Sequence, residues 1–273
     1  MLASLLITFR ETLEAALVVG IVLGYLSKTN RRSMFKNVYY AVGAGIFASI
    51  IGAVLFNILA GGFEGRAEEI FEGITMLVGA ALLTTMIMWI LGKADVALKL
   101  TNNVDNSLIK NGTMGIFLIV FMAILREGIE TVIFLNASVY ATGETSLLGS
   151  IIGILLAIVL SFLLFKGLMK VSLKKFFLIT NILLILFAAG LVAHGLHELQ
   201  EAKLFPVVIE HIWDINPEVV VDGSYPALHE KGTVGSIFKG LFGYNGNPTL
   251  LETLAYWLYL ITIMFIWKKK INK

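Results

Sequence analysis

The chain has 273 residues, of which 58% are hydrophobic and only 15% are charged, and its formal net charge is +2. Soluble domains carry about 25% charged residues, so the composition indicates a membrane protein with no sizeable soluble domain. The absence of cysteine excludes disulfides, thiolate metal sites and cysteine nucleophiles. Any metal ion would therefore be held by carboxylate, imidazole, backbone carbonyl or, less favourably, thioether groups.

Seven apolar segments are long enough to cross a bilayer as helices, which takes about 20 residues. They cover residues 2–26, 38–60, 70–91, 114–138, 147–169, 175–194 and 250–267. The first segment is interrupted by charges and lacks the pattern of a cleaved signal peptide, so we expect it to be the first spanning helix. The sequence predicts an all-α, polytopic membrane protein with seven transmembrane helices.

Basic residues predict the orientation of these helices. Most of the 21 Lys and Arg residues lie in alternate connections, namely loop 27–37, loop 92–113, the turn at 166–175 and the C-terminal tail. The other connections carry only Arg66, Lys203, Lys231 and Lys239. Because basic loops remain on the cytoplasmic side, we expect the N-terminus outside and the C-terminus inside.

The first and fourth apolar segments each contain the motif Arg-Glu-x-x-Glu. The two copies are Arg10-Glu11-Thr12-Leu13-Glu14 and Arg126-Glu127-Gly128-Ile129-Glu130. A charged side chain at the centre of a spanning helix costs about 2.5–3.5 kcal/mol on insertion scales, so such residues usually mark a substrate pathway. In a helix, the Arg and the second Glu of each motif lie one turn apart on the same face.

The paired motifs predict a cation site. Two Arg and four Glu leave an excess of negative charge, and carboxylate oxygens are the ligands of hard cations. The Arg residues would moderate that charge so that the ion can leave. The alternative is a structural role, in which internal salt bridges lock the two helices together, although apolar packing achieves this at lower cost.

The two motifs also suggest an inverted repeat. With the N-terminus outside, the first and fourth helices run in opposite directions, so residues 1–91 and 114–194 form two three-helix repeats. Residues 195–249 then form an outer loop, and residues 250–273 form the seventh helix and a basic tail. In secondary transporters, paired motifs in such repeats surround a substrate site near the membrane midplane.

A second group of candidate ligands lies at the outer ends of two helices. His194, His197, Glu198 and Glu201 have the spacing of one helical face and could capture a transition metal. Glu72 is the deepest of the acidic residues that begin the third helix. The alternative interpretations are a solvated helix end, and acidic residues that simply favour a helix N-terminus.

The loops carry weaker signals. We expect a short surface helix within the inner loop 92–113 and an amphipathic stretch at 207–213. A turn is expected near Asn216-Pro217, and Pro248 suits the start of the last helix.

These motifs resemble those of the oxidase-dependent iron permeases, which include the high-affinity iron permeases of fungi and their bacterial relatives. The resemblance covers nearly the whole chain and includes Glu72-Gly73, the run HGLHELQE at 194–201 and the run FGYNGNP at 242–248. Thr12 stands where the family usually has the Gly that Gly128 retains. The acidic outer-loop motif of the fungal members has no clear match.

The resemblance implies an iron permease of a bacterial cytoplasmic membrane and no enzyme activity. It implies that Glu11, Glu14, Glu127 and Glu130 coordinate iron, with Arg10 and Arg126 as their charge partners. Iron would be the transported substrate, and no permanently bound cofactor is expected. A separate extracytoplasmic oxidase or iron-delivery protein is implied as a partner, a homo-oligomer stays open, and no nucleic acid is expected to bind.

Two other functions remain compatible with the residues. A transporter of another divalent metal, such as lead or manganese, could use the same carboxylates. An intramembrane enzyme could use paired carboxylates for acid–base chemistry. No nucleophile or His lies beside the motifs, which disfavours the enzyme.

Overall fold

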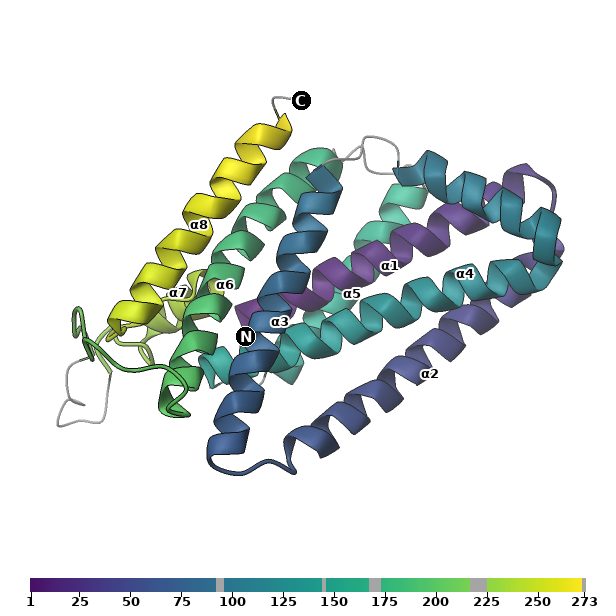
Figure 1. Cartoon of the computed structure of the whole chain (residues 1–273). Helices are drawn as coiled ribbons and strands as arrows, with labels where there is room; N and C mark the ends of the chain where they lie inside the picture. Colours follow the sequence, from purple (N-terminus) through teal and green to yellow (C-terminus); the bar gives the residue numbers. More distant parts are fainter. Residues whose placement is uncertain (92–95, 144–145, 167–172, 217–224, 272–273) are drawn as a thin grey trace.

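The computed structural model of the chain describes residues 1–91, 96–143, 146–166, 173–216 and 225–271, and the secondary structure of these residues is entirely helical. The described helices are α1 (Leu2–Lys28), η1 (Arg32–Met34), α2 (Phe35–Ala60), α3 (Arg66–Leu91), α4 (Val96–Thr142), α5 (Leu147–Phe165), α6 (Leu173–Glu201), α7 (Thr233–Phe242) and α8 (Leu250–Ile271). Figure 1 shows α3, α6 and α8 grouped on one side and α1, α2 and α4 extending away from them. The predicted all-α class is confirmed.

Each predicted apolar segment corresponds to a helix, but only some of these helices qualify as spans by length and composition. Five described helical segments are long and apolar enough to cross a membrane, in α2, α3, α5, α6 and α8. The motif helices α1 and α4, each with three charges in five residues, are not among them. The chain is thus a helical membrane protein, while seven spans and their orientation stay predictions.

Helix boundaries differ from the predicted segments at several points. α4 begins at Val96, so the expected surface helix forms its first part, which joins the apolar part at Gly112 with non-helical dihedral angles (φ 56°, ψ −134°). α6 continues to Glu201, which places residues 194–201 in regular helix. α7, in the outer loop, was not predicted. The expected turn at Asn216-Pro217 falls partly outside the described residues.

The predicted amphipathic stretch at 207–213 is wrong. Its backbone is irregular and all its side chains are exposed. The segment instead runs beside residues 246–250, and the two exchange backbone hydrogen bonds, including Ile212 N–H to the Pro248 carbonyl at 3.0 Å. Backbone pairing between two irregular segments leaves no helical periodicity and therefore no buried face.

Small residues bring α5 into close contact with α1. The buried positions of α5 repeat every four residues and are all small, at Gly149, Gly153, Ala157 and Ser161. A Cβ atom at Gly153 would collide with the backbone of Leu5 and the hydroxyl of Thr8. Small residues spaced in this way let helix backbones approach closely within a membrane. This contact supports α1 along the N-terminal half that carries the first motif.

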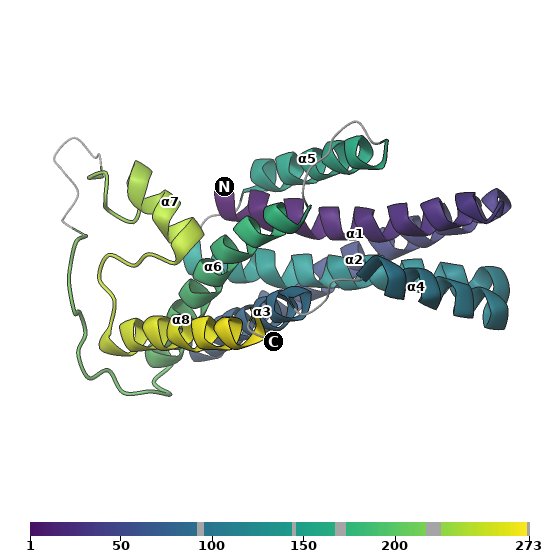
Figure 2. The ribbon, with the colours of Figure 1, turned by 90° about the horizontal axis from the view of Figure 1, so that it is seen from above.

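The remaining helix contacts follow a reciprocal pattern. α1 packs mainly on α5, and α2 packs mainly on α4, while α1 also crosses α4, and α3 lies against α6. The view in Figure 2 shows α5 beside α1 and the α3, α6 and α8 group to one side. Although α3 also packs on α4 without a comparable contact between α6 and α1, exchanging α1, α2 and α3 with α4, α5 and α6 maps the four contacts above onto one another. This is the pattern that an internal repeat predicts.

The outer loop is organised by a partly buried Glu230. Its carboxylate pairs with the Lys239 ammonium at 2.8 Å and accepts hydrogen bonds from the Gly246 amide N–H and the Asn216 side chain. Burial raises the pKa of this carboxyl, but these partners outweigh it and hold the pKa below its usual range. Gly243, in the left-handed conformation that ends α7, lies directly against Gly190 of α6. The loop is thus fastened to the helices.

We expect Gly153→Ala to destabilise the protein, because the added methyl group would meet backbone atoms of α1 that cannot rotate away. Overpacking of this kind costs about 1–3 kcal/mol. The control is Gly43→Ala in α2, where no neighbouring atom lies within 4 Å and the helix propensity of Ala is favourable. Thermal unfolding in detergent should show a lower midpoint for Gly153→Ala only. Equal midpoints would contradict the close α1–α5 contact.

Candidate metal-transport site

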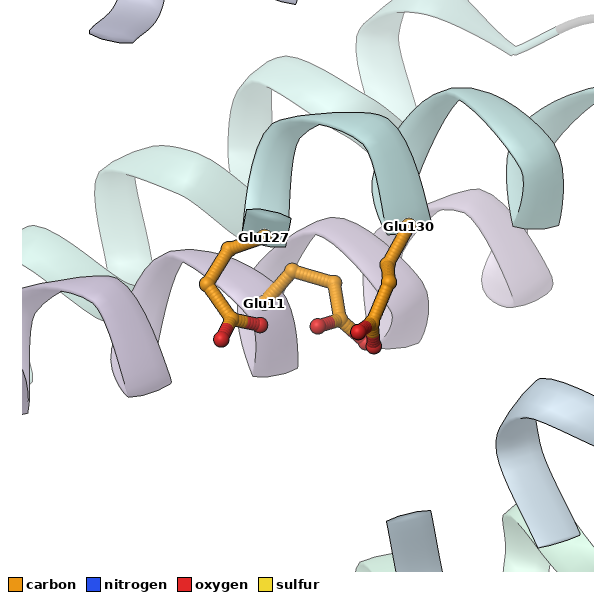
Figure 3. A group of neighbouring side chains, drawn as sticks. All are labelled: Glu11, Glu127 and Glu130. Atoms are coloured by element: carbon orange, nitrogen blue, oxygen red, sulfur yellow. The ribbon is translucent and has the colours of Figure 1, made fainter. Parts of the chain in front are cut away.

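Three acidic side chains from α1 and α4 meet where the two helices cross. Glu11, Glu127 and Glu130 each place a carboxylate oxygen within 4.8 Å of the others. Figure 3 shows the side chains of Glu127 and Glu130 descending from α4 towards Glu11 on α1. Glu11 and Glu130 are buried, and Glu127 is partly buried. Among the described residues, no other three acidic or His side chains approach so closely.

The geometry follows from the motif spacing and the helix directions. α1 and α4 run in opposite directions, so one helix rises along the chain while the other descends (Figure 1). Glu127 and Glu130 lie on one face of α4, three residues apart, and this face meets Glu11. The sequence prediction that both motifs contribute carboxylates to one place is therefore realised in the geometry of three of the four Glu residues.

Arg10 connects the first motif to a third helix. Its guanidinium lies 2.5 Å from a Glu11 oxygen and 2.6 Å from a Glu14 oxygen, and it also contacts the sulfur of Met86 on α3. The Arg10 side chain is only 1% exposed. The predicted pairing with Glu14 is present, and the additional contact with Glu11 was not predicted. Arg10 thus fixes both carboxylates of its own motif.

Arg126 pairs as predicted but in a different setting. Its Nε lies 2.8 Å from a Glu130 oxygen, whereas its side chain is 58% exposed. The two motifs are therefore similar in sequence and unequal in burial. Residue spacing cannot reveal this difference, because it depends on which helices pack beside each motif.

The cluster has unused acceptor oxygens. Within the described part of the chain, Oε2 of Glu11, Glu127 and Glu130 is buried without a hydrogen-bond partner. Buried carboxylate oxygens without partners are costly, and neighbouring carboxylates repel one another. A bound cation removes both costs, because hard cations take carboxylate oxygens as ligands. The chemistry of this donor set suits a multivalent metal ion.

Glu14 differs from the other three motif carboxylates. It is partly exposed, at 19%, and lies against Arg10 outside the close group. It is near enough to Glu130 and Arg126 to interact with them electrostatically. Glu14 therefore borders the cluster, and its predicted role as a metal ligand stays a prediction.

The second predicted group separates into two parts at the outer end of α6. His197 lies between two carboxylates, with Nε2 3.2 Å from Glu201 and Nδ1 3.0 Å from Glu252. Glu198 and Glu72 interact electrostatically with each other and with Glu201. His194 is buried and its Nδ1 lies 3.0 Å from the Gly190 carbonyl of its own helix.

Glu252 was missed by the sequence reasoning. It is 1% exposed at the start of α8, where its side chain accepts hydrogen bonds from the Thr249 amide and from Asn245. The Glu252 amide in turn donates to the Thr249 hydroxyl, which completes a capping box. The pattern Thr-x-x-Glu before an apolar run signals such a cap. Its contact with His197 could not be read from the sequence.

The family model described as "Iron permease FTR1 family" matches residues 1–270. The chain belongs to this family. It is 34% identical over 265 residues to an uncharacterized protein of Archaeoglobus fulgidus, with 97% of this chain and 93% of the relative covered. No solved structure shows a significant match.

Relatives with a functional name match over nearly their whole length. The chain is 32% identical over 270 residues to the ferrous iron permease EfeU of Yersinia pestis, covering 97% of this chain and 93% of that protein. It is 31% identical over 265 residues to EfeU of Escherichia coli O6:H1, covering 96% and 93%. The resemblance to iron permeases drawn from the motifs is thus confirmed, and this family is one of permeases, consistent with the expectation of no enzyme activity.

The unequal burial of the two Arg residues predicts unequal stability effects. Arg10→Ala would leave two carboxylates near the crossing without their cation, and breaking a buried pair costs about 3–5 kcal/mol. Arg126→Ala removes a guanidinium that is more than half exposed and pairs with one carboxylate only, so we expect a smaller loss of stability. Thermal unfolding in detergent should place Arg10→Ala well below Arg126→Ala. The reverse order would contradict the deeper burial of Arg10 relative to Arg126.

Proposed function

We propose that this chain imports iron across the cytoplasmic membrane of a bacterium through the site formed by α1 and α4. Glu11, Glu127 and Glu130 would hold the ion, and Glu14 would complete the ligand set. The observation that carries the proposal is the meeting of three carboxylates, with unpartnered buried oxygens, inside a chain of the iron permease family. The site would lie near the midplane of the membrane.

The donor atoms favour a hard or borderline cation. The close group consists of carboxylates alone, and the sulfur of Met86 is directed to Arg10. Carboxylate oxygens bind ferrous, ferric and manganous ions, and the ligand type alone does not separate them. The relatives named as ferrous iron permeases support ferrous iron as the first substrate to test. Lead and manganese are the competing substrates.

The reciprocal helix contacts support an inverted repeat around this site. We propose that residues 1–91 and 114–194 are the two repeats and that α8 is added to them. In transporters of this architecture, one repeat moves against the other and exposes a fixed midplane site to each side in turn. The excess of carboxylate over Arg would bind the ion, and the two Arg residues would limit the affinity so that the ion can leave.

The outer end of α6 would raise the local concentration of iron. Glu72, Glu198 and Glu201 interact electrostatically there, and His197 lies beside them between Glu201 and Glu252. An acidic surface at the mouth of a pathway attracts cations and speeds their arrival. The separate oxidase or delivery protein and the homo-oligomer stay predictions of the sequence.

Glu130→Gln is expected to abolish iron uptake, because it removes one charge and one strong ligand from the close group. The assay is radioactive iron uptake into proteoliposomes that contain only this chain, measured for ferrous and for ferric iron. We expect a fall of at least about tenfold, with unchanged amounts of folded protein.

The matched control for this assay is Glu210→Gln, which removes an exposed carboxylate in the outer loop and should transport normally. Wild-type uptake by Glu130→Gln would sink the proposal. If manganese or lead displaced iron at equal concentration, the carboxylate group would still be a metal-transport site, and its preferred substrate would be that metal.

Glu198→Gln is expected to act on ion capture alone. The half-saturating iron concentration should rise several-fold in low salt, while the maximal rate stays close to that of the wild type, because the midplane ligands are unchanged. High salt should reduce the difference, since it screens exposed charges. A lower maximal rate at an unchanged half-saturating concentration would contradict a role in capture.

A further inference from the structure

A cavity of about 270 Å³ lies at the outer ends of the two motif helices. It is bounded by the beginning of α1, the end of α4, α7 and the segment before α7. Its polar lining is provided by Ser4, Ser138, Thr142, Glu230, Ser236 and Lys239. Liquid water takes roughly 30 Å³ per molecule, so the cavity has space for about nine waters. A metal ion with a complete hydration shell fits this volume.

The cavity is aligned with the carboxylate cluster. Ser138 lies eight residues beyond Glu130 on α4, which is roughly 12 Å at a rise of 1.5 Å per residue. Ser4 lies seven residues before Glu11 on α1, roughly 10 Å away. Because these helices run in opposite directions and cross at the cluster, both serines lie on the outer side of it. The cavity therefore sits above the site on the same two helices.

One apolar layer separates the cavity from the cluster. Ile7 lies one turn from Glu11, and Phe134 lies one turn from Glu130, each on the side towards the cavity. Both are almost completely buried, at 1% and 0%, within the same hydrophobic core. A layer of this kind excludes a hydrated ion until the side chains move. Along the two helices, Ile7 and Phe134 thus lie between the serines of the cavity and the carboxylates.

On the inner side of the crossing, the positions that correspond to the two serines are apolar. The motif offset of 116 residues relates Ser4 to Val120 and Ser138 to Val22. Val22 and Val120 are both 0% exposed, and they pack in a second apolar core with Val38 and Ile116. The outer arm of the crossing therefore holds a cavity with polar groups in its lining, whereas the corresponding inner positions are apolar and buried.

We propose that this cavity is the outer vestibule through which a hydrated multivalent cation reaches Glu11 and Glu130, with Ile7 and Phe134 as the layer that it must pass. The inference rests on the proposed iron transport. The hydroxyls of Ser4, Ser138 and Ser236 would contact the hydration shell, and the Glu230–Lys239 ion pair would fix α7 as the outer wall.

The absence of cysteine allows a direct test, because each introduced thiol is the only one in the full-length chain. Ser138→Cys and Ala137→Cys are adjacent, and both positions are almost fully buried, but only Ser138 lines the cavity. Cells that express each variant are treated from outside with a membrane-impermeant cationic methanethiosulfonate. We expect Ser138→Cys to react at least tenfold faster than Ala137→Cys. Equal rates would overturn the vestibule.

Iron uptake after modification tests whether the cavity is on the pathway. Modified Ser138→Cys should lose uptake, while the wild type treated with the same reagent should not. Unchanged uptake after complete modification would place the cavity off the pathway and overturn the proposal. Ser236 lies on α7, on the opposite wall of the cavity. If unmodified Ser138→Cys transports poorly, the reaction rate and the iron uptake after modification are measured on Ser236→Cys instead. Absent wild-type uptake would count against iron transport, whereas the reaction rates would still decide access to the cavity.

A deeper thiol tests the apolar layer. Glu130→Cys should stay unreactive in the otherwise wild-type chain and become reactive when Phe134→Ala is added. Fast reaction of Glu130→Cys with Phe134 in place would show an open route and contradict the layer. No reaction in the double variant would show that Phe134 does not close the route.

Discussion

The structure depends on how a few buried charges are compensated where α1 crosses α4. Arg10 is enclosed by Glu11, Glu14 and Met86, and it stabilises two carboxylates that would otherwise be placed in an apolar interior at high cost. Among the described residues, Glu130 of the second motif pairs with Arg126, which is more than half exposed. Compensation is therefore incomplete, and we propose that the remaining negative charge makes the crossing a binding site for a cation.

The other helices hold this crossing in place. α5 supports α1 through a stripe of small residues, and α2 supports α4, where Gly128 of the second motif lies against Ser49. Thr12 occupies the corresponding position of the first motif, so only the second motif uses its glycine for this contact. The outer loop is fastened by Glu230 and by the contact between Gly243 and Gly190. These contacts allow a charged crossing to persist within an apolar protein.

The helices could be predicted because apolar runs of spanning length reflect the bilayer directly. The meeting of the two motifs was expected from their paired occurrence in an inverted repeat, and helical spacing places Glu127 and Glu130 on one face of α4. The unequal burial of Arg10 and Arg126 depends on neighbouring helices, which spacing does not specify. α7 and the contact between Glu252 and His197 arise from the folding of the outer loop, whose short segments show no periodic pattern. The prediction of an amphipathic stretch at 207–213 was wrong for the same reason.

We propose that the transported ion is bound by the carboxylates where α1 crosses α4. The most direct measurement is the anomalous X-ray scattering of iron in crystals of the iron-loaded protein. The account predicts a peak within coordination distance of Glu11, Glu127 and Glu130. Iron found only at the outer end of α6, with the crossing free of it in protein that transports, would contradict the account.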